Sequence, residues 1–301
     1  MKKMVLIITN TADRTVDYIC DNYKNVDFKR LNVDKFSEYR ITIDNLTGWT
    51  IIDEKWDKPL TAKDVFSIYY RKPALPALNI YKEEYQIMIG KDIMAIIEGI
   101  VNSFQGKVLT KPAILRKCEN KIFQLLYAQK HFKNIPRSTI GNDCGTMLGS
   151  NSVIKPISVG KIYLGSKCEI FQTCLFDGDF SEDISLTPLY LQEYVCKQYE
   201  VRVTVIDKEF FSVKIESTDK VDWRSHDAVN KYTIIDIPDS IKTQCLELLD
   251  NFELIFGAFD YIVNPNDEWI FLEVNPNGQW QWLEYELGLK ISNSIVNYLT
   301  R

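Results

Sequence analysis

The sequence predicts an α/β fold, and three observations carry that prediction. The chain begins with a β-branched run at Met4–Ile8, an amphipathic segment at Ala12–Tyr23 and an apolar run at Val26–Leu31, which is the order of a βαβ unit. A long segment, Glu83–Phe104, carries isoleucines at helical spacing and predicts a core helix. Near the other end, apolar runs flank the turn signal Asn264–Asp267 and predict a β-hairpin.

The composition is globular and excludes several classes of protein. Of 301 residues, 46% are hydrophobic and 26% are charged, which suffices for two or three packed lobes. A net charge of −5 without a basic block argues against nucleic acid as the main ligand. No run reaches transmembrane length, so we expect no membrane partner. Seven scattered cysteines without a Cys-x-x-Cys motif indicate a reducing cytosol, and we expect a cytoplasmic protein.

The remaining N-terminal elements are a hairpin and a further strand. Arg40–Asp44 and Trp49–Asp53 flank Leu-Thr-Gly and predict the hairpin, and Val65–Tyr70 predicts the strand. This strand runs into Arg71-Lys72-Pro73, where the proline ends it. Because ligands of open α/β sheets gather at the carboxyl ends of strands, Arg71 is a candidate for binding a carboxylate or phosphate. A solvated strand end is the alternative.

Single charged residues inside apolar runs mark the rest of the chain. Asn120 opens an amphipathic helix that starts with Lys121, and Lys155 stands alone in the predicted strand Val153–Gly160. A lysine among apolar neighbours requires an anion, and phosphate fits. On the predicted strand Tyr199–Val205, Glu200 and Arg202 share one face, where they are either functional or a surface ion pair. Glu209–Ile215 completes that hairpin, and helices are predicted at Asp239–Asn251 and Ser292–Leu299.

The C-terminal hairpin carries a candidate metal site. Glu273 and Asn275 are two residues apart and point to the same face. With Asn264–Asp267 as the loop, Asp260 falls opposite Phe271 and joins that face. Two carboxylates about 4 Å apart repel by roughly 4 kcal/mol at an effective dielectric constant of about 20. Mg²⁺, which prefers oxygen ligands, would compensate this repulsion. The alternative is a pair of surface acids on an edge hairpin.

These motifs resemble a known family. Asp260 followed by Glu273-Val-Asn275-Pro is similar to the metal signature of ATP-grasp ligases. Asn-Gly-Gln-Trp after that proline, together with Asp222-Trp223-Arg224, resembles the branch of peptide maturases that make graspetides (microviridin-like peptides). Tyr70-Arg71-Lys72-Pro73 is similar to a Tyr-Arg-Arg-Pro motif of the same branch, with lysine in place of one arginine.

The resemblance implies an ATP-grasp fold of three lobes. They are an N-terminal pre-ATP-grasp lobe (1–110), a central lobe (111–188) and a C-terminal lobe (189–301), with the nucleotide cleft between the last two. Leu189–Val195 resembles the hinge strand whose main-chain groups bind adenine. The implied roles are nucleotide binding by Lys121, Lys155, Gln192, Glu193, Val195 and Glu200; catalysis by Arg202 and Arg224; metal binding by Asp260, Glu273 and Asn275; and substrate binding by Arg71, Lys214, Asp222 and Trp223.

The activity that the resemblance implies is ATP-dependent peptide macrocyclisation. ATP and two Mg²⁺ ions would serve phosphorylation of an Asp or Glu side chain, and a Lys amine or Ser/Thr hydroxyl would then attack the acyl phosphate. The partners would be a ribosomal precursor peptide with leader and core segments and a second copy in a homodimer. The loop Ser158-Val159-Gly160 would offer N–H groups to phosphate.

Two rival functions stay open at this point. One is an ATP-grasp ligase that adds a free amino acid to a small-molecule or protein carboxylate, against which Pro-Asn-Gly-Gln-Trp and Asp-Trp-Arg argue. The other is a non-catalytic nucleotide- or peptide-binding module, against which the presence of all three expected metal ligands and both lysines argues. Trp280 and Trp282 are candidates for lining the substrate cleft, with core packing as the alternative.

Overall fold

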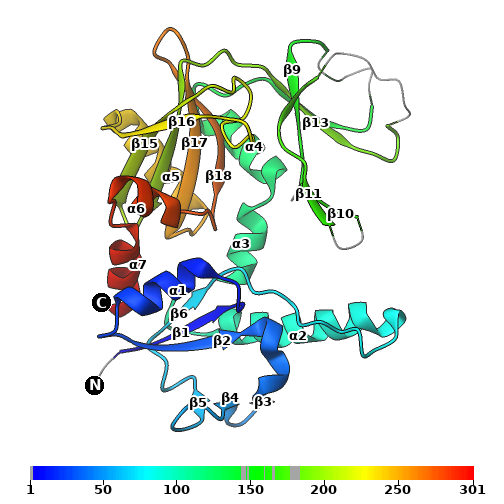
Figure 1. Ribbon diagram of the computed structural model, residues 1–301, viewed down its shortest axis with the longest axis vertical. Helices are drawn as coiled ribbons and strands as arrows, with labels where there is room; N and C mark the ends of the chain where they lie inside the picture. The colour runs from blue at the N-terminus through cyan, green and yellow to red at the C-terminus, as the bar shows by residue number, and fades with distance from the viewer. Residues whose placement is uncertain (1–2, 144–146, 148, 159, 165–166, 177–183) are drawn as a thin grey trace. The chain divides into compact units, whose positions relative to one another are not determined.

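The computed structural model describes residues 3–143, 147, 149–158, 160–164, 167–176 and 184–301 (Figure 1). The chain divides into two compact units. Unit 1 holds Met1–Arg116, Glu253–Phe256 and Lys290–Arg301, and unit 2 holds Lys117–Phe252 and Gly257–Leu289. No helix within the described ranges is long and apolar enough to cross a membrane.

Unit 1 is built on a parallel sheet, as the βαβ pattern predicts. Its strand order is β2–β1–β6–β7, and every neighbouring pair is parallel. Residues Val5–Ile8 of β1 are fully buried because helices cover both faces of such a sheet. The strands are β1 Met4–Thr9, β2 Asp27–Asn32, β6 Ser67–Tyr70 and β7 Lys107–Leu109, and the helices are α1 Arg14–Asn22, α2 Glu83–Ser103 and α7 Ile291–Thr300.

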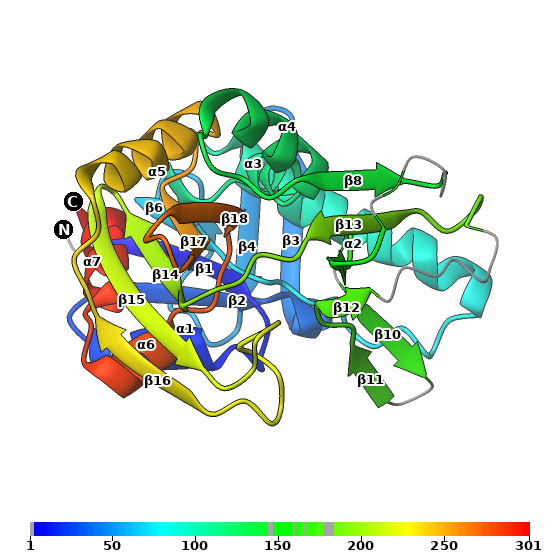
Figure 2. The same ribbon diagram turned by 90° about the horizontal axis from the view of Figure 1, so that it is seen from above.

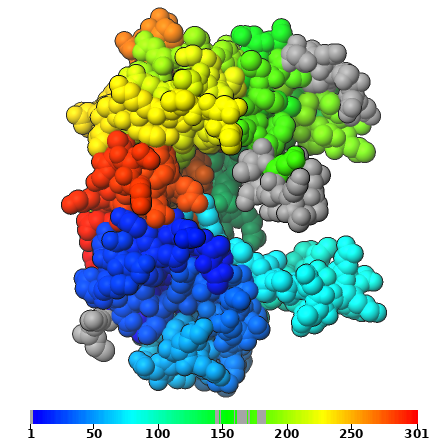
Figure 3. All heavy atoms as spheres, in the orientation of Figure 1, coloured from blue at the N-terminus to red at the C-terminus, as the bar shows by residue number. Residues whose placement is uncertain are grey.

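Two additions complete unit 1. A 3-10 helix, Val33–Glu38, leads into a small antiparallel sheet of β3 Tyr39–Asp44, β4 Gly48–Asp53 and β5 Leu60–Thr61. The start of α2 and the residues just before it project from the unit (Figure 3). They expose apolar side chains, such as Ile80 before the helix and Ile87 within it. The C-terminal helix α7 returns to the parallel sheet, where Ser67 Oγ donates to the Leu299 carbonyl over 2.7 Å.

Unit 2 contains two larger antiparallel sheets and a small hairpin (Figure 2). One sheet has the order β12–β9–β13–β8 and the other β16–β15–β14–β17–β18. The strands are β8 Ser138–Gly141, β9 Ser152–Lys155, β12 Cys174–Phe176 and β13 Leu189–Glu193; β14 Tyr199–Ile206, β15 Glu209–Ser217, β16 Asn230–Ile234, β17 Phe256–Val263 and β18 Trp269–Asn275; and the hairpin strands β10 Lys161–Leu164 and β11 Lys167–Ile170.

Unit 2 has three helices among its described residues, and polar side chains anchor the first of them, α4. The three are α4 Lys121–His131, α5 Asp239–Asn251 and α6 Gln281–Leu287, while α3 Pro112–Cys118 carries the chain from unit 1 to unit 2. Asn120 caps α4 by accepting from the N–H groups of Ile122 and Phe123. The buried amide of Gln124 then bonds both the N–H and the carbonyl of Val274, which ties α4 to β18.

The C-terminal hairpin forms, but its register differs from the expected one. Val263 pairs with Trp269, so the turn is one residue longer than the four residues of the sequence-based expectation. A register shift between Asp260 and Tyr261 then places Asp260 opposite Glu273, so the expectation that it lies opposite Phe271 was wrong. Such an irregularity re-aims a side chain, and here it brings the two carboxylates directly across from one another.

Two other expectations concern the end of strand β9 and the residues that follow it. Strand β9 ends at Lys155 because Pro156 has no N–H to donate, whereas the expected strand continued to Gly160. In the proposed phosphate loop, Val159 lies outside the described residues. Gly160 packs closely against the Phe171 carbonyl, and the Gly160 carbonyl accepts from the Phe171 N–H over 2.7 Å. The division into three lobes stays a prediction.

Arg71 is held inside unit 1 rather than presented at the strand end. It is 1% exposed, and its Nε lies 3.2 Å from a carboxylate oxygen of Asp13, the N-cap of α1. The hydroxyl of Thr15 accepts from the same guanidinium, and Thr9 donates to Asp13. The guanidinium buried against this carboxylate links β6 to α1, and the expected substrate role of Arg71 stays a prediction.

This arrangement predicts that Arg71→Met destabilises unit 1. Removing one partner of a buried ion pair leaves the other charge uncompensated, at a cost of about 3 kcal/mol. The urea-unfolding midpoint, followed by circular dichroism, should fall clearly. Lys24→Met, which removes an exposed ion pair with Asp21, is the control and should leave the midpoint almost unchanged. Equal midpoints for the two variants would contradict the structural role of Arg71.

Candidate functional site

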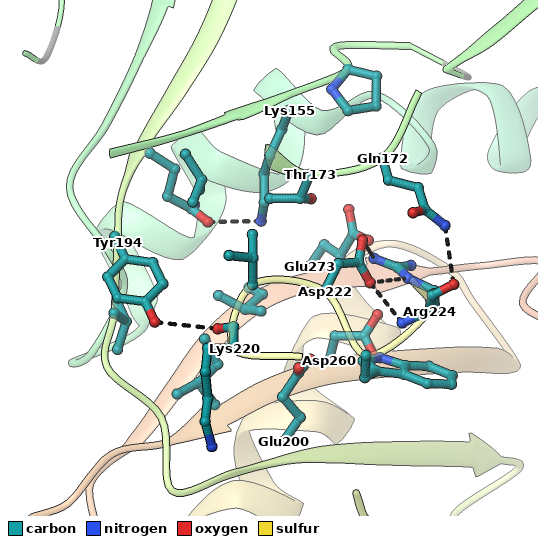
Figure 4. Close-up of a pocket in the computed structure, with 18 of the residues that line it drawn as sticks. Lys155, Gln172, Thr173, Tyr194, Glu200, Lys220, Asp222, Arg224, Asp260 and Glu273 are labelled. Atoms are coloured by element: carbon teal, nitrogen blue, oxygen red, sulfur yellow. Dashed lines mark hydrogen bonds and ion pairs between the residues drawn. The ribbon is translucent and has the colours of Figure 1, made fainter. Parts of the chain in front are cut away.

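Unit 2 contains a pocket of about 420 Å³ between its two larger sheets (Figure 4). Strands β9 and β13 contribute one wall, and β14, β17 and β18 contribute the other. A loop between β15 and β16 closes one side with its segment 220–224. The charged side chains that line the pocket are Lys121, Lys155, Glu193, Glu200, Lys220, Asp222, Arg224, Asp260 and Glu273.

The centre of this pocket is a pair of acids surrounded by cations. Asp260 and Glu273 face one another across β17 and β18. Arg202 Nε lies 2.9 Å from Asp260, and Lys121 Nζ lies 3.6 Å from Glu273. Burial raises the pKa of Asp260 more than Arg202 and Arg224 lower it. For Glu273, burial is outweighed by Lys121, Lys155 and the two arginines, which bring its pKa to about 2.

The two lysines of the pocket are oriented by neighbouring polar groups. Lys155 Nζ donates to Gln192 Oε1 over 2.7 Å, and Lys121 Nζ donates to the Pro156 carbonyl over 2.8 Å. The amide nitrogen of Gln192 in turn donates to the hydroxyls of Ser138 and Tyr190. Burial lowers the pKa of Lys155, against the opposing effect of Glu273. The Gln192 amide therefore fixes where the Lys155 ammonium points.

Main-chain hydrogen bonds fix the end of β13 and the residue after it at the other end of the pocket. The N–H of Glu193 donates to the Arg137 carbonyl over 2.8 Å, and the N–H of Tyr194 donates to the Asn151 carbonyl over 3.0 Å. These two donors hold the segment against neighbouring chain. Val195, the next residue along, lines the pocket.

Glu200 and a lysine form a buried ion pair on the pocket floor. Lys197 Nζ contacts the carboxylate of Glu200 and lies 3.4 Å from the Val221 carbonyl. Both side chains are under 10% exposed as whole residues. Burial raises the pKa of Glu200, and Lys197 partly offsets that effect.

Asp222, Trp223 and Arg224 form one unit on the closing loop. The carboxylate of Asp222 accepts from Arg224 Nε over 2.9 Å and from its second nitrogen over 3.3 Å, which aims the guanidinium. The Trp223 ring is within cation–π distance of both arginines, with Arg202 5.9 Å and Arg224 5.8 Å from its centroid. Trp282 supports the same ring at 5.4 Å. One indole therefore positions both arginines.

Several solved structures share the fold of this chain. No protein-family model and no curated protein matches the chain, but solved structures do. The macrocyclase MdnC from Microcystis aeruginosa, bound with its precursor peptide MdnA, superposes with a TM-score of 0.84 at 25% identity over 98% of this chain and 99% of its own. The chain has the ATP-grasp fold.

Further structures fit this assignment. An ATP-grasp ligase associated with ribosomal peptides from Chryseobacterium gregarium, in complex with ADP and a leader and core peptide, gives a TM-score of 0.83 at 24% identity over 99% of this chain and 95% of its own. D-alanyl-alanine synthetase A from Vibrio cholerae gives only 0.59 at 11% identity, over 99% and 98%. The shared ATP-grasp architecture is thus closer in shape to the peptide ligases than to the amino-acid ligase.

Four residues expected at the site are not among those that line this pocket. Asn275 follows Glu273 on β18, but its side-chain oxygen accepts from the N–H of Asn277 over 3.0 Å, and it does not line the pocket. Lys214 pairs across strands with Val201, on the face opposite Glu200 and Arg202, and its ammonium lies 3.0 Å from Glu216. The expected substrate role of Lys214 stays a prediction that this placement does not support. The other two are Arg202, which contacts Asp260 without being one of the lining residues, and Arg71, which belongs to unit 1.

The expected cleft tryptophans also differ from one another. Trp280 is fully buried, which fits the alternative of core packing. Trp282 packs on Trp223 and Tyr232, with the latter centroid at 5.0 Å. Trp282 therefore packs against the indole that contacts Arg202 and Arg224.

Sequence reasoning missed several residues of the ATP-grasp pocket. Gln172 and Thr173 line it, and Gln172 donates to the Arg224 carbonyl over 3.0 Å. Tyr194 and Lys220 also line it (Figure 4), and Lys197 contacts the lining residues Glu200 and Val221. A lysine three residues before Glu200 was the one available signal, since buried acids require a partner. Nothing in the local pattern separates the others from surface residues.

The donor set fits Mg²⁺. Asp260 and Glu273 offer carboxylate oxygens at one place, and Mg²⁺ prefers oxygen ligands and retains waters. Among the described residues, no three His, Cys, Asp or Glu side chains cluster as a metal site, so a third protein ligand would have to be an amide such as Asn275. The ring of lysines and arginines around the acids fits the phosphates that accompany such an ion.

Gln192→Leu tests whether this amide positions Lys155. The substitution keeps the approximate volume but removes the acceptor of the ammonium. We expect affinity for Mg²⁺–ADP to fall about tenfold, equivalent to about 1.4 kcal/mol, as measured by calorimetry. Gln105→Leu, at an exposed position of unit 1, is the matched control. Unchanged affinity in Gln192→Leu would contradict the positioning role.

The lowered pKa of Lys155 predicts a pH dependence. Because burial disfavours the charged form, the ammonium loses its proton at a lower pH than an ordinary lysine, whose pKa is about 10.4. Affinity for Mg²⁺–ADP should therefore fall as pH rises through the alkaline range below that value. Lys155→Arg keeps its charge and should abolish the decline. Identical profiles for the two proteins would exclude Lys155 as the titrating group.

Proposed function

We propose that this chain is an ATP-dependent peptide macrocyclase. It phosphorylates an Asp or Glu side chain of a ribosomal precursor peptide and condenses it with a Lys amine or a Ser/Thr hydroxyl to form an amide or ester crosslink. The observation that carries the proposal is the opposed pair Asp260 and Glu273 in one pocket, with Lys121, Lys155 and Arg224 in the same lining and Arg202 in contact with Asp260. The likeness to MdnC and to the Chryseobacterium ligase supports a peptide as the substrate.

In the first step, a carboxylate oxygen of the peptide attacks the γ-phosphorus of ATP. The bond to the β,γ-bridging oxygen breaks, and ADP leaves with that electron pair. Mg²⁺ on Asp260 and Glu273, with two ions as our expectation, would neutralise phosphate charge. Lys121 and Lys155 hold the phosphates, and Arg202 stabilises the charge that develops on the transferred group. This step depends on in-line placement and electrostatic stabilisation, because phosphoryl transfer requires little covalent participation by the protein.

In the second step, the amine or hydroxyl attacks the carbonyl carbon of the acyl phosphate. Inorganic phosphate leaves with the electron pair of the broken C–O bond, and the nucleophile loses a proton. Arg224, aimed by Asp222, would grip the peptide carboxylate through parallel N–H donors in the first step and the acyl oxygen in the second. The site has to exclude water at this stage, since hydrolysis competes for the same intermediate.

The remaining assignments concern the nucleotide and the partners. Adenine would bind main-chain groups between Glu193 and Val195, and the ribose would donate to Glu200. Asn275 would turn from its local hydrogen bond to join Asp260 and Glu273 at the metal. The leader segment of the precursor binds away from the chemistry, the protein is a homodimer, and it works in the cytoplasm.

The proposal is tested by mass spectrometry of a precursor peptide co-expressed with the chain from a neighbouring gene. We expect loss of one water per ring, formed only with Mg²⁺ and ATP. Glu273→Gln keeps the shape but removes a metal-binding charge and should lower the rate at least about 100-fold. Glu253→Gln is the control, because this residue lies in unit 1.

The same experiment separates the rival functions. ATP turnover that requires a free amino acid and no peptide would replace the proposal with an amino-acid ligase. Binding of Mg²⁺–ATP without release of phosphate under any of these conditions would indicate a non-catalytic module.

A further inference from the structure

Lys197 has a position that none of the roles above uses. It lies between β13 and β14, is 9% exposed, and is an ammonium group with two partners on different segments. One partner is the carboxylate of Glu200, on the pocket floor. The other is the carbonyl of Val221, on the loop that carries Arg224. A buried lysine is costly, so an ammonium that bridges two parts of a site calls for a reason.

A second contact joins the same two segments. The hydroxyl of Tyr194 donates to the carbonyl of Lys220 over 3.3 Å (Figure 4). Tyr194 and Lys197 therefore hold two consecutive carbonyls of the loop, Lys220 and Val221. Both donors belong to the stretch that leads from the proposed adenine-binding strand to Glu200. The loop is thus attached to the nucleotide side of the pocket immediately before Asp222.

The loop itself is internally stiff. The carboxylate of Asp219 accepts from the N–H groups of Val221 and Asp222, over 2.7 and 2.9 Å. The carbonyl of Asp222 accepts from Ser225, and its side chain accepts from the N–H and the guanidinium of Arg224. These hydrogen bonds connect the Val221 segment to Arg224, so a shift of the Val221 carbonyl should also shift Arg224.

We propose that Lys197 is a positioning residue that couples the nucleotide site to the substrate-carboxylate site. A nucleotide that orders Glu200 also orders Lys197, and Lys197 then holds the loop that aims Arg224. Bound nucleotide thereby prepares the guanidinium for the peptide carboxylate, and by linkage a bound peptide strengthens nucleotide binding. This inference rests on the proposed function, because it assumes that nucleotide binds beside Glu200.

Hydrogen exchange of the full chain, measured by mass spectrometry with saturating Mg²⁺–ADP as the only probe, tests the coupling. In the wild type, nucleotide should slow amide exchange in 219–225 about tenfold. In Lys197→Met the slowing in 219–225 should be less than about twofold, although protection of 193–195 by nucleotide persists. Lys197→Arg retains a cation with several donors and should restore the slowing. Lys242→Met, which removes an exposed ion pair on α5, is the control.

The outcomes distinguish this inference from the proposed function. Full protection of 219–225 in Lys197→Met, or no protection in a wild type that binds Mg²⁺–ADP, would overturn the coupling and leave the macrocyclase proposal intact. A wild type that does not bind Mg²⁺–ADP would overturn both. If Lys197→Met does not fold, Tyr194→Phe removes the second attachment and keeps the ring. It should reduce the protection of 219–225 at saturating nucleotide, and unchanged protection there would count against the coupling.

Discussion

Two carboxylates held side by side, Asp260 and Glu273, are the constraint on which this site depends. Adjacent strands place them there, and burial then magnifies their repulsion. Cationic side chains near the two acids offset this repulsion, and Arg202 and Lys121 are in contact with them. The same cations would bind phosphate once a divalent ion takes over the carboxylates. The repulsion between the two acids destabilises the fold, and the same arrangement would favour binding of a metal-bound triphosphate.

Most of the surrounding polar network serves to aim these charges. Gln192 orients Lys155, Asp222 orients Arg224, and the Trp223 indole supports Arg202 and Arg224 together. Each of these contacts fixes a long, flexible side chain whose ordering would otherwise cost entropy at the moment of reaction. Phosphoryl transfer gains mostly from charges that are already in place. Rigid supporting side chains are therefore as much a part of the proposed chemistry as the cations they hold.

The fold was largely predictable because its signals are local. The βαβ opening, helix α5 and the strands of both C-terminal hairpins follow from apolar periodicity and turn residues, which act within a few positions of one another. The short strands β10–β12 and helix α6 were not predicted, since such brief elements carry too few residues for a period to emerge. The longer turn after Val263 and the irregularity beside Asp260 also gave no local signal, yet they decide which residue faces Glu273.

The sequence by itself determined which chemistry the chain can support: the acids, lysines and arginines, their strands, and the family signature that connects them. Only the tertiary structure decided which of those groups meet. It placed Lys155 against Gln192 and Lys197 between Glu200 and Val221, and it buried Arg71 against Asp13. The reason is physical: a charge in a folded protein is satisfied by whichever partner packing brings within a few ångströms, and most of these partners are distant in the chain.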